Sequence, residues 1–187
     1  RMTLRAAVER LQFEGVLLRR PGRGGGTFVA QESPVVELAS VRGILAQLSA
    51  ETVTSRVLAA EVVDGECAPQ EVTAALGVRA GGVVRLNRVR NVAGEPAMLE
   101  DSWFPADLVP GLLEEDLTGS MYRLLRDRYG SEPVGKREVL QPGSAGAEEA
   151  AHLGIGARHP VLRIERTAYR ADGRAVEYSL DTYRSDR

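Results

Sequence analysis

The chain has 187 residues, of which 43% are hydrophobic and 27% are charged, a balance ordinary for a globular protein. No apolar run reaches the 18 residues of a membrane span, and no signal-peptide pattern is present. The single Cys67 cannot form an internal disulfide, which fits a reducing cytoplasm, and one cysteine with two histidines disfavours a structural zinc site.

The net charge of −2 is unevenly distributed along the chain. Residues 1–23 contain six arginines and two glutamates, a balance of +4, so the remaining residues carry −6. A basic N-terminal segment joined to an acidic body is typical of a protein that contacts phosphates with one domain and not with the other.

The first 30 residues predict a helix followed by a two-stranded hairpin. Apolar residues recur at helical spacing over residues 2–14, and Gly15 ends that helix. Residues 16–20 and 27–30 then read as strands around a glycine-rich basic tip. This order, a helix for the major groove and then a positively charged wing, indicates the working end of a winged helix-turn-helix. The earlier helices of such a module are not in the sequence, so we expect this domain to be truncated.

Six residues of this segment are candidate DNA contacts. Arg1 and Arg5 lie one helical turn apart near the helix N-terminus, where arginine is the usual partner of a guanine edge. The short hydroxyl of Thr3 suits a phosphate or a thymine methyl. The wing contributes Arg20, Gly22 and Arg23. The alternative is a solvated helix face and an exposed loop, and the combination of helix and wing favours DNA binding over it.

From residue 38 onward the patterns predict an α+β domain with an antiparallel sheet flanked by helices. Helices are expected over residues 38–49, 69–76, 121–129 and 144–153. Strands are expected over residues 52–63, 83–92, 96–104, 134–141, 161–171 and 174–184. Two hairpins close across Ala93-Gly94-Glu95 and Asp172-Gly173. We therefore divide the chain into a DNA-binding part (residues 1–30), a linker (31–40) and a second domain (41–187).

The second domain contains a loose internal echo at an offset of 77 to 78 residues. The stretch from Leu76 through Arg88 to Glu100 resembles the stretch from Leu153 through Arg166 to Glu177. Two copies of a helix followed by a hairpin suggest a pseudo-symmetric sheet.

Polar side chains alternate onto one face of several predicted strands. Arg88 and Arg90 share a strand face, and with the three-residue loop Val92 opposes Pro96 and Arg88 opposes Glu100. Glu177, with Ser179, Asp181 and Tyr183, alternates onto one face of the last strand. Ser120 begins a helix, whose free N–H groups and dipole favour an anion. The interpretations left open are a site for a small anionic molecule, or a structural Arg88–Glu100 ion pair with Ser120 as a simple cap.

Catalysis is the weaker hypothesis. The carboxylates resemble an acid–base pair only in residue type, and no nucleophile–base arrangement accompanies them. The glycine-rich tip lacks the lysine and the preceding long strand of a phosphate-binding loop. We expect no enzyme activity, no cofactor and no metal.

Two sets of motifs resemble known families. Arg1-Met2-Thr3-Leu4-Arg5, Leu11, Glu14-Gly15 and residues 22–28 are similar to the DNA-binding signature of GntR-family bacterial transcription factors. The remainder resembles UTRA, the effector-sensing domain of the HutC subfamily, which shares its fold with chorismate lyase. That resemblance rests on Arg88-Val89-Arg90, Gly94-Glu95-Pro96, Glu100, Ser120-Met121-Tyr122, Val176-Glu177-Tyr178 and residues 183–187.

The resemblance implies a cytoplasmic, homodimeric transcriptional regulator, most often a repressor, whose affinity for operator DNA depends on a small anionic metabolite. A chorismate lyase-like enzyme acting on a small anionic substrate is the alternative, although it leaves the basic wing unexplained. Matching positions in sugar-phosphate-sensing relatives imply an effector site built from Arg88, Arg90, Glu100, Ser120, Tyr122, Glu177 and Tyr183.

One segment departs from the family pattern. Such relatives carry a [ST]-[FL]-[ST]-E segment that supplies hydroxyl and backbone donors to a phosphate, and here the matching stretch reads Gly43-Ile44-Leu45-Ala46. Both the hydroxyl and the carboxylate are missing. An effector other than a sugar phosphate is therefore equally allowed.

Overall fold

The structure is a computed structural model that describes residues 3–13, 16–20, 22, 25–29, 53–78 and 81–186. The chain forms two compact units, Arg1–Val35 and Val36–Arg187, which we describe separately. The linker expected over 31–40, the helix expected over 38–49 and the departing stretch 43–46 lie outside the described residues.

The first unit contains one helix and one hairpin. Helix α1 (Leu4–Phe13) begins after Thr3, whose hydroxyl accepts a hydrogen bond from the Ala6 amide at 3.4 Å. Strands β1 (Leu17–Arg20) and β2 (Gly26–Val29) pair antiparallel. The order of helix and wing is the one that the sequence predicts.

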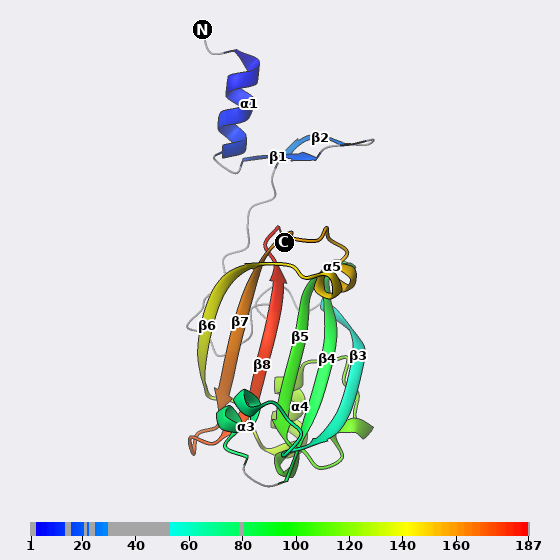
Figure 1. The fold of residues 1–187 in the computed structure, drawn as a ribbon, viewed down its shortest axis with the longest axis vertical. Coiled ribbons are helices and arrows are strands. Elements are labelled where there is room, and N and C mark those ends of the chain that lie inside the picture. The colour runs from blue at the N-terminus through cyan, green and yellow to red at the C-terminus, as the bar shows by residue number, and fades with distance from the viewer. Residues whose placement is uncertain are drawn as a thin grey trace. The chain divides into compact units, whose positions relative to one another are not determined.

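The second unit is built on one antiparallel sheet of six strands, in the order β3-β4-β5-β8-β7-β6 (Figure 1). The strands are β3 (Val53–Asp64), β4 (Gly82–Val92), β5 (Glu95–Pro105), β6 (Gly135–Ser144), β7 (Pro160–Tyr169) and β8 (Ala175–Arg184). The predicted helix at 144–153 is shorter, because β6 runs to Ser144 and α5 begins at Ala147.

The sheet consists of two halves with the same order of elements. The first half is β3, α3 (Gln70–Leu76), β4 and β5, and the second is β6, α5 (Ala147–Leu153), β7 and β8. The halves meet where β5 pairs with β8. The echo in the sequence therefore corresponds to a repeated structural unit.

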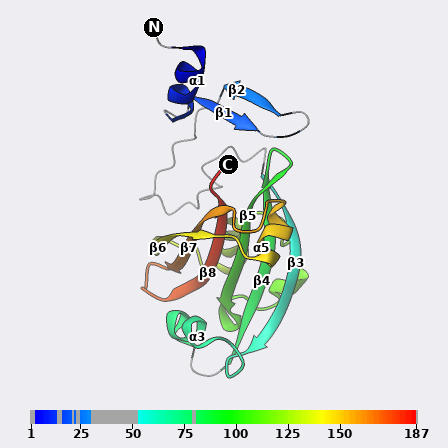
Figure 2. The same ribbon diagram turned by 45° about the horizontal axis from the view of Figure 1, so that its top comes forward.

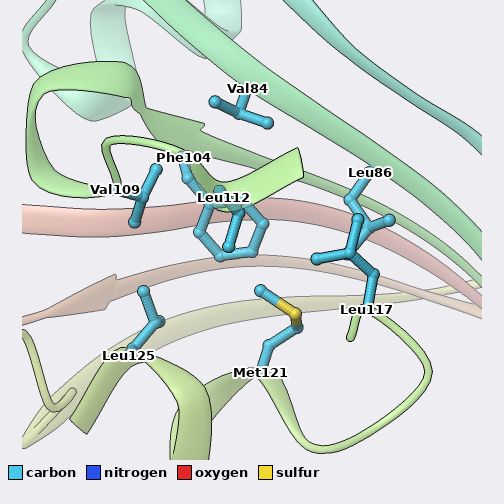
Figure 3. Close-up of a cluster of buried hydrophobic side chains, with 8 residues drawn as sticks. All are labelled: Val84, Leu86, Phe104, Val109, Leu112, Leu117, Met121 and Leu125. Atoms are coloured by element: carbon cyan, nitrogen blue, oxygen red, sulfur yellow. The ribbon is translucent and has the colours of Figure 1, made fainter. Parts of the chain in front are cut away.

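Helices cover both faces of the sheet. Helices α3 and α5 lie on one face at its opposite ends (Figure 2), and α3 packs against Trp103 and Tyr178. Helix α4 (Met121–Tyr129) lies on the other face, where Met121 and Leu125 point at the buried ring of Phe104 (Figure 3). This cluster also contains Val84, Leu86, Val109, Leu112 and Leu117, and it fills one end of the α4 face with apolar side chains.

The β4–β5 hairpin corrects one detail of the predicted register. The turn contains two residues, Ala93 and Gly94, both in the left-handed region with φ of 51° and 80°. Val92 therefore opposes Glu95 and not Pro96. A bulge at Ala97 absorbs the difference, because Asn91 faces Pro96 while Arg90 faces Met98. Arg88 still opposes Glu100, as predicted.

Candidate functional site

A band of polar side chains crosses the α4 face between two apolar clusters. At one end lies the cluster around Phe104, and at the other lies a cluster containing Met98, Ile164 and Tyr183. Two rows of cross-strand partners form the band: Ser102–Ser179–Arg166–Glu138 and Arg88–Glu100–Asp181. We call these seven residues, together with Arg90, Lys136 and Glu177, the polar band.

Arg88 is fully buried and its charge is paired within the protein, although its Nη2 makes no hydrogen bond to the described residues. Its side chain is 0% exposed, its Nε donates to Glu100 Oε2 at 2.8 Å, and its Nη2 lies 2.5 Å from the same oxygen. Its Nη1 donates to the carbonyl oxygens of Leu117 at 2.6 Å and Gly119 at 3.0 Å. Arg88 thus ties the segment before α4 to the sheet, and it positions that segment.

Arg90 lies one pleat further along β4 and is less completely paired. Its Nη1 donates to Glu100 Oε2 at 3.4 Å, and its side chain is 14% exposed. Its Nε is buried without a hydrogen-bond partner among the described residues. Burial by itself raises the pKa of Glu100, but the charges of Arg88, Arg90 and Arg166 outweigh it and hold that pKa below its ordinary value.

Glu177 on β8 accepts hydrogen bonds from three side chains. The Tyr122 hydroxyl donates to its Oε2 at 2.8 Å, Ser102 donates to its Oε1 at 3.1 Å, and Arg166 Nε donates to its Oε2 at 3.3 Å. Burial and the charge of Glu177 raise the pKa of Tyr122 well above its ordinary value, so Tyr122 remains a hydrogen-bond donor. Helix α4 is therefore connected to the sheet through Glu177.

Ser120 and Tyr183 occupy the margins of the band. Ser120 is exposed and caps α4, since its hydroxyl accepts from the Arg123 amide at 3.4 Å. Tyr183 is 8% exposed in the apolar cluster with Met98, and burial followed by the charge of Asp181 raises its pKa well above the ordinary value. The structure thus gathers six predicted residues around the sheet face and leaves Ser120 at its rim.

Asp181 and Ser179 are the two polar-band residues of β8 whose side-chain oxygens lack hydrogen bonds in the described part of the chain. Arg166 Nη2 lies 3.0 Å from Asp181 Oδ2, yet neither Asp181 oxygen accepts a hydrogen bond from the residues described. The Ser179 hydroxyl, on a residue that is 0% exposed, also has no partner there. Burial first, and then the neighbouring carboxylates, raise the pKa of Asp181 to about 7 despite Arg166.

Sequence reasoning did not include Arg166 or Glu138 among the candidate residues. Arg166 is buried and lies 3.3 Å from Glu177, 3.0 Å from Asp181 and 3.7 Å from Glu138. The internal echo contains the missing clue, because it aligns Arg166 with Arg88 and Glu177 with Glu100. Glu138 lies on the edge strand β6, where nothing in the alternation distinguishes it from a solvated residue.

The predicted DNA contacts are described only in part. Arg5 is exposed and pairs with Glu9 at 3.2 Å on the surface of α1, and Gly22 adopts a φ of 101° in the wing. Arg1 and Arg23 lie outside the described residues, and the side chain of Arg20 is not described. Within the described ranges, no helix is long and apolar enough to cross a membrane, and no group of side chains is arranged to hold a metal.

Comparison with known proteins identifies relatives across the whole chain. The UTRA domain family matches residues 49–187. The HTH-type transcriptional repressor NagR of Bacillus subtilis is 34% identical over 191 residues, which cover 100% of this chain and 76% of NagR. The crystal structure of PhnF from Mycobacterium smegmatis superposes with a TM-score of 0.73 at 26% identity, covering 98% of this chain and 80% of PhnF. The PhnF effector domain superposes with a TM-score of 0.67 at 30% identity, covering 73% of this chain and 83% of that domain.

Proposed function

Since the chain belongs to the GntR family of transcriptional regulators and carries their UTRA domain, we propose that a small anionic metabolite on its polar band controls its affinity for operator DNA. The protein is a regulator and not an enzyme, and the chorismate lyase-like alternative is not favoured. NagR and PhnF are named as repressors, which supports the same role here.

The observation that carries the proposal is the set of buried polar atoms without partners on one sheet face. The buried atoms of the band without hydrogen bonds to the described residues are Arg88 Nη2, Arg90 Nε, Lys136 Nζ, Ser179 Oγ and both Asp181 oxygens. Each such atom costs about 1–3 kcal/mol when it is left without a partner. A polar ligand lying across the band offers those partners, which gives the protein a reason to keep this arrangement.

The residues divide into those that contact the effector and those that hold the contacts in place. We assign the anionic group to Arg90 and to the amides that begin α4 at Ser120. Glu100, Tyr122, Glu177 and Tyr183 hydrogen-bond the uncharged part of the molecule. Arg88 acts as a positioning residue, because its four close polar contacts are made within the protein.

The first unit supplies the DNA contacts in this proposal. The exposed Arg5 and the basic residues of the wing lie in a segment whose charge is +4, which favours phosphates. The DNA-binding set comprises Arg1, Thr3, Arg5, Arg20, Gly22 and Arg23. A palindromic operator requires two recognition helices related by a dyad, so we propose a cytoplasmic homodimer.

A thermal-shift screen of sugar phosphates, amino sugars and organic anions tests the effector site. A compound that binds the band raises the melting temperature of the wild type, and Arg90→Ala reduces that shift because it removes the cation that anchors the anionic group. Arg126→Ala serves as the control, since Arg126 pairs with Asp127 on the exposed side of α4. Equal stabilisation of the wild type and Arg90→Ala by every active compound contradicts the assignment.

A further inference from the structure

The charges in the second half of the sheet are not balanced. The carboxylates of Glu138, Glu177 and Asp181 face two cations, Arg166 and Lys136. Lys136 is 2.9 Å from Glu138, so Arg166 is left between the other two carboxylates at 3.3 and 3.0 Å. All five side chains are at most 8% exposed. When all these groups are ionised, this half carries one negative charge in excess, and the first half, where Arg88 and Arg90 face the single Glu100, carries one positive charge in excess. Burying a charge away from its partner is costly.

Three buried oxygen atoms without hydrogen bonds to the described residues lie in the same half of the band. Asp181 has two carboxylate oxygens without hydrogen bonds in the described part of the chain, and two residues earlier on β8 the Ser179 hydroxyl has none. Ser179 and Asp181 share a strand face with Glu177. In the first half, by contrast, the atoms without hydrogen bonds among the described residues are the arginine nitrogens Arg88 Nη2 and Arg90 Nε, while Glu100 is paired with Arg88 at 2.5 Å and Arg90 at 3.4 Å.

From these two observations we infer that Asp181 and Ser179 form a second subsite, which binds a protonated amine of the effector. The ammonium group donates to the Asp181 carboxylate and to the Ser179 hydroxyl, and it balances the excess negative charge of the β6–β7–β8 half. This inference rests on the proposed function, since it concerns the chemistry of the same effector. It makes Asp181 a specificity-determining residue.

The alternatives to an amine satisfy fewer of the requirements. A second anionic group is repelled by Glu177, Asp181 and Glu138. A neutral hydroxyl group supplies one hydrogen bond and leaves the charge uncompensated. An ammonium group supplies three donors and one positive charge. It also stabilises the ionised form of Asp181, whose pKa burial and neighbouring carboxylates otherwise raise to about 7.

Matched pairs of ligands test the inference by calorimetric titration of the full chain. The probes are glucosamine 6-phosphate with glucose 6-phosphate, phosphoethanolamine with glycol phosphate, and 2-aminoethylphosphonate with 2-hydroxyethylphosphonate. Each pair differs only in an amine or a hydroxyl group. We expect at least one amine to bind the wild type about tenfold more tightly than its hydroxyl twin, the other compound of its pair. A charge-assisted hydrogen bond contributes a difference in binding free energy of this size. Asp181→Asn brings the two affinities to within about threefold and leaves the hydroxyl twin unchanged.

Two further variants keep the test decisive. Asp101→Asn is the matched control, because Asp101 is the cross-strand neighbour of Leu180 on the opposite face and pairs with Arg85 at 2.9 Å, and it retains the preference for the amine. Ser179→Ala reduces the preference about threefold without removing a charge, which covers the case that Asp181→Asn fails to fold.

Three outcomes overturn the inference: no amine binds better than its twin, none of the six compounds binds, or Asp181→Asn keeps the preference. If the hydroxyl compounds bind as tightly as the amines and Arg90→Ala weakens their binding, the amine subsite is wrong and the proposed function still holds. If every compound binds Arg90→Ala with the same affinity as the wild type, the proposed function is contradicted instead.

Discussion

Arg88 shows how a residue that matches a binding motif can serve the fold. Replacing it with alanine leaves Glu100 buried at 4% exposure with Arg90 at 3.4 Å, and it removes two hydrogen bonds to carbonyl oxygens of the segment before α4. Breaking a buried ion pair from one side costs about 3–5 kcal/mol. We expect Arg88→Ala to lose free energy of unfolding by this amount in urea denaturation.

The Arg88 prediction has two controls. Arg126→Ala breaks an exposed pair with Asp127, so its urea midpoint stays close to that of the wild type. The double variant Arg88→Ala/Glu100→Ala removes both buried charges and recovers part of the loss. A single Arg88→Ala variant as stable as the wild type means that the pair adds nothing to the fold.

Asp181 makes stability depend on pH in the direction opposite to most acidic residues. Its pKa is raised from 3.8 to about 7 in the folded chain, so the folded state holds this proton more tightly than the unfolded state. Its contribution is complete below pH 3.8 and is lost as the pH rises to about 7, at roughly 1.4 kcal/mol per unit. The groups acting on it are Arg166, Glu100, Glu177, Glu138, Tyr122 and Tyr183.

The measurement is chemical denaturation of the effector-free chain at pH 5, 6, 7 and 8. Asparagine cannot titrate, so Asp181→Asn becomes more stable relative to the wild type as the pH rises through this window. Parallel curves for the two proteins mean that Asp181 ionises normally in the fold.

At the scale of elements, the β4–β5 turn contains a residue that is not suited to it. Ala93 adopts a φ of 51°, where a side chain other than that of asparagine, aspartate or glycine is strained by about 1–2 kcal/mol. We expect Ala93→Asn to stabilise the chain by about 0.5–1 kcal/mol, seen as a rise in melting temperature of about 1–4 °C. Ala93→Val, which is β-branched, lowers the melting temperature, and an unchanged value for both variants contradicts this backbone geometry.

The same hairpin shows what the sequence determines and what it leaves open. Alternation on two strands placed Arg88 opposite Glu100, because side-chain direction has a period of two. The predicted loop was one residue too long, and that error did not spread, because a bulge at Ala97 restores the register. Bulges depend on how a strand twists against its neighbours, and a single sequence does not encode that visibly.

The sequence predicts only part of the polar band. Residues on β4, β5 and β8 stood out because charged side chains alternate with apolar ones there. Arg166 is equally buried, but the next residue on β7, Glu165, is exposed. Since both are charged, the sequence does not show which of them is buried. What distinguishes them is the pairing of β7 with β8, a contact between strands that only the folded sheet establishes.

At the scale of the whole molecule, the two repeated halves differ in how completely their buried charges are paired. Arg88 and Glu100 neutralise each other at the seam of the first half, and their contacts hold the segment that begins α4. Arg166 must serve three carboxylates in the second half, so Asp181 remains without a hydrogen bond among the described residues. The duplicated frame thus places a paired arginine and glutamate in one half and, in the other, a carboxylate without hydrogen bonds to the described residues.

Control of DNA binding by an effector is a coupling free energy between two sites, and such coupling is reciprocal. If the effector lowers the affinity for operator DNA by a given factor, operator DNA lowers the affinity for the effector by the same factor. We expect this factor to lie between about 5 and 150, measured by fluorescence anisotropy of labelled operator and by calorimetry with effector.

The salt dependence of operator affinity distinguishes residues that contact DNA from residues that couple the effector to DNA binding. The +4 segment at residues 1–23 makes operator affinity fall steeply with salt, and that slope belongs to the phosphate contacts. Arg90→Ala lies in the other unit, so it reduces the coupling factor and leaves the salt slope as in the wild type. Arg5→Ala does the reverse, because it removes one cation from the basic segment and none from the polar band. A change in both quantities for Arg90→Ala means that Arg90 affects DNA directly, and the separation of roles between the two units then fails.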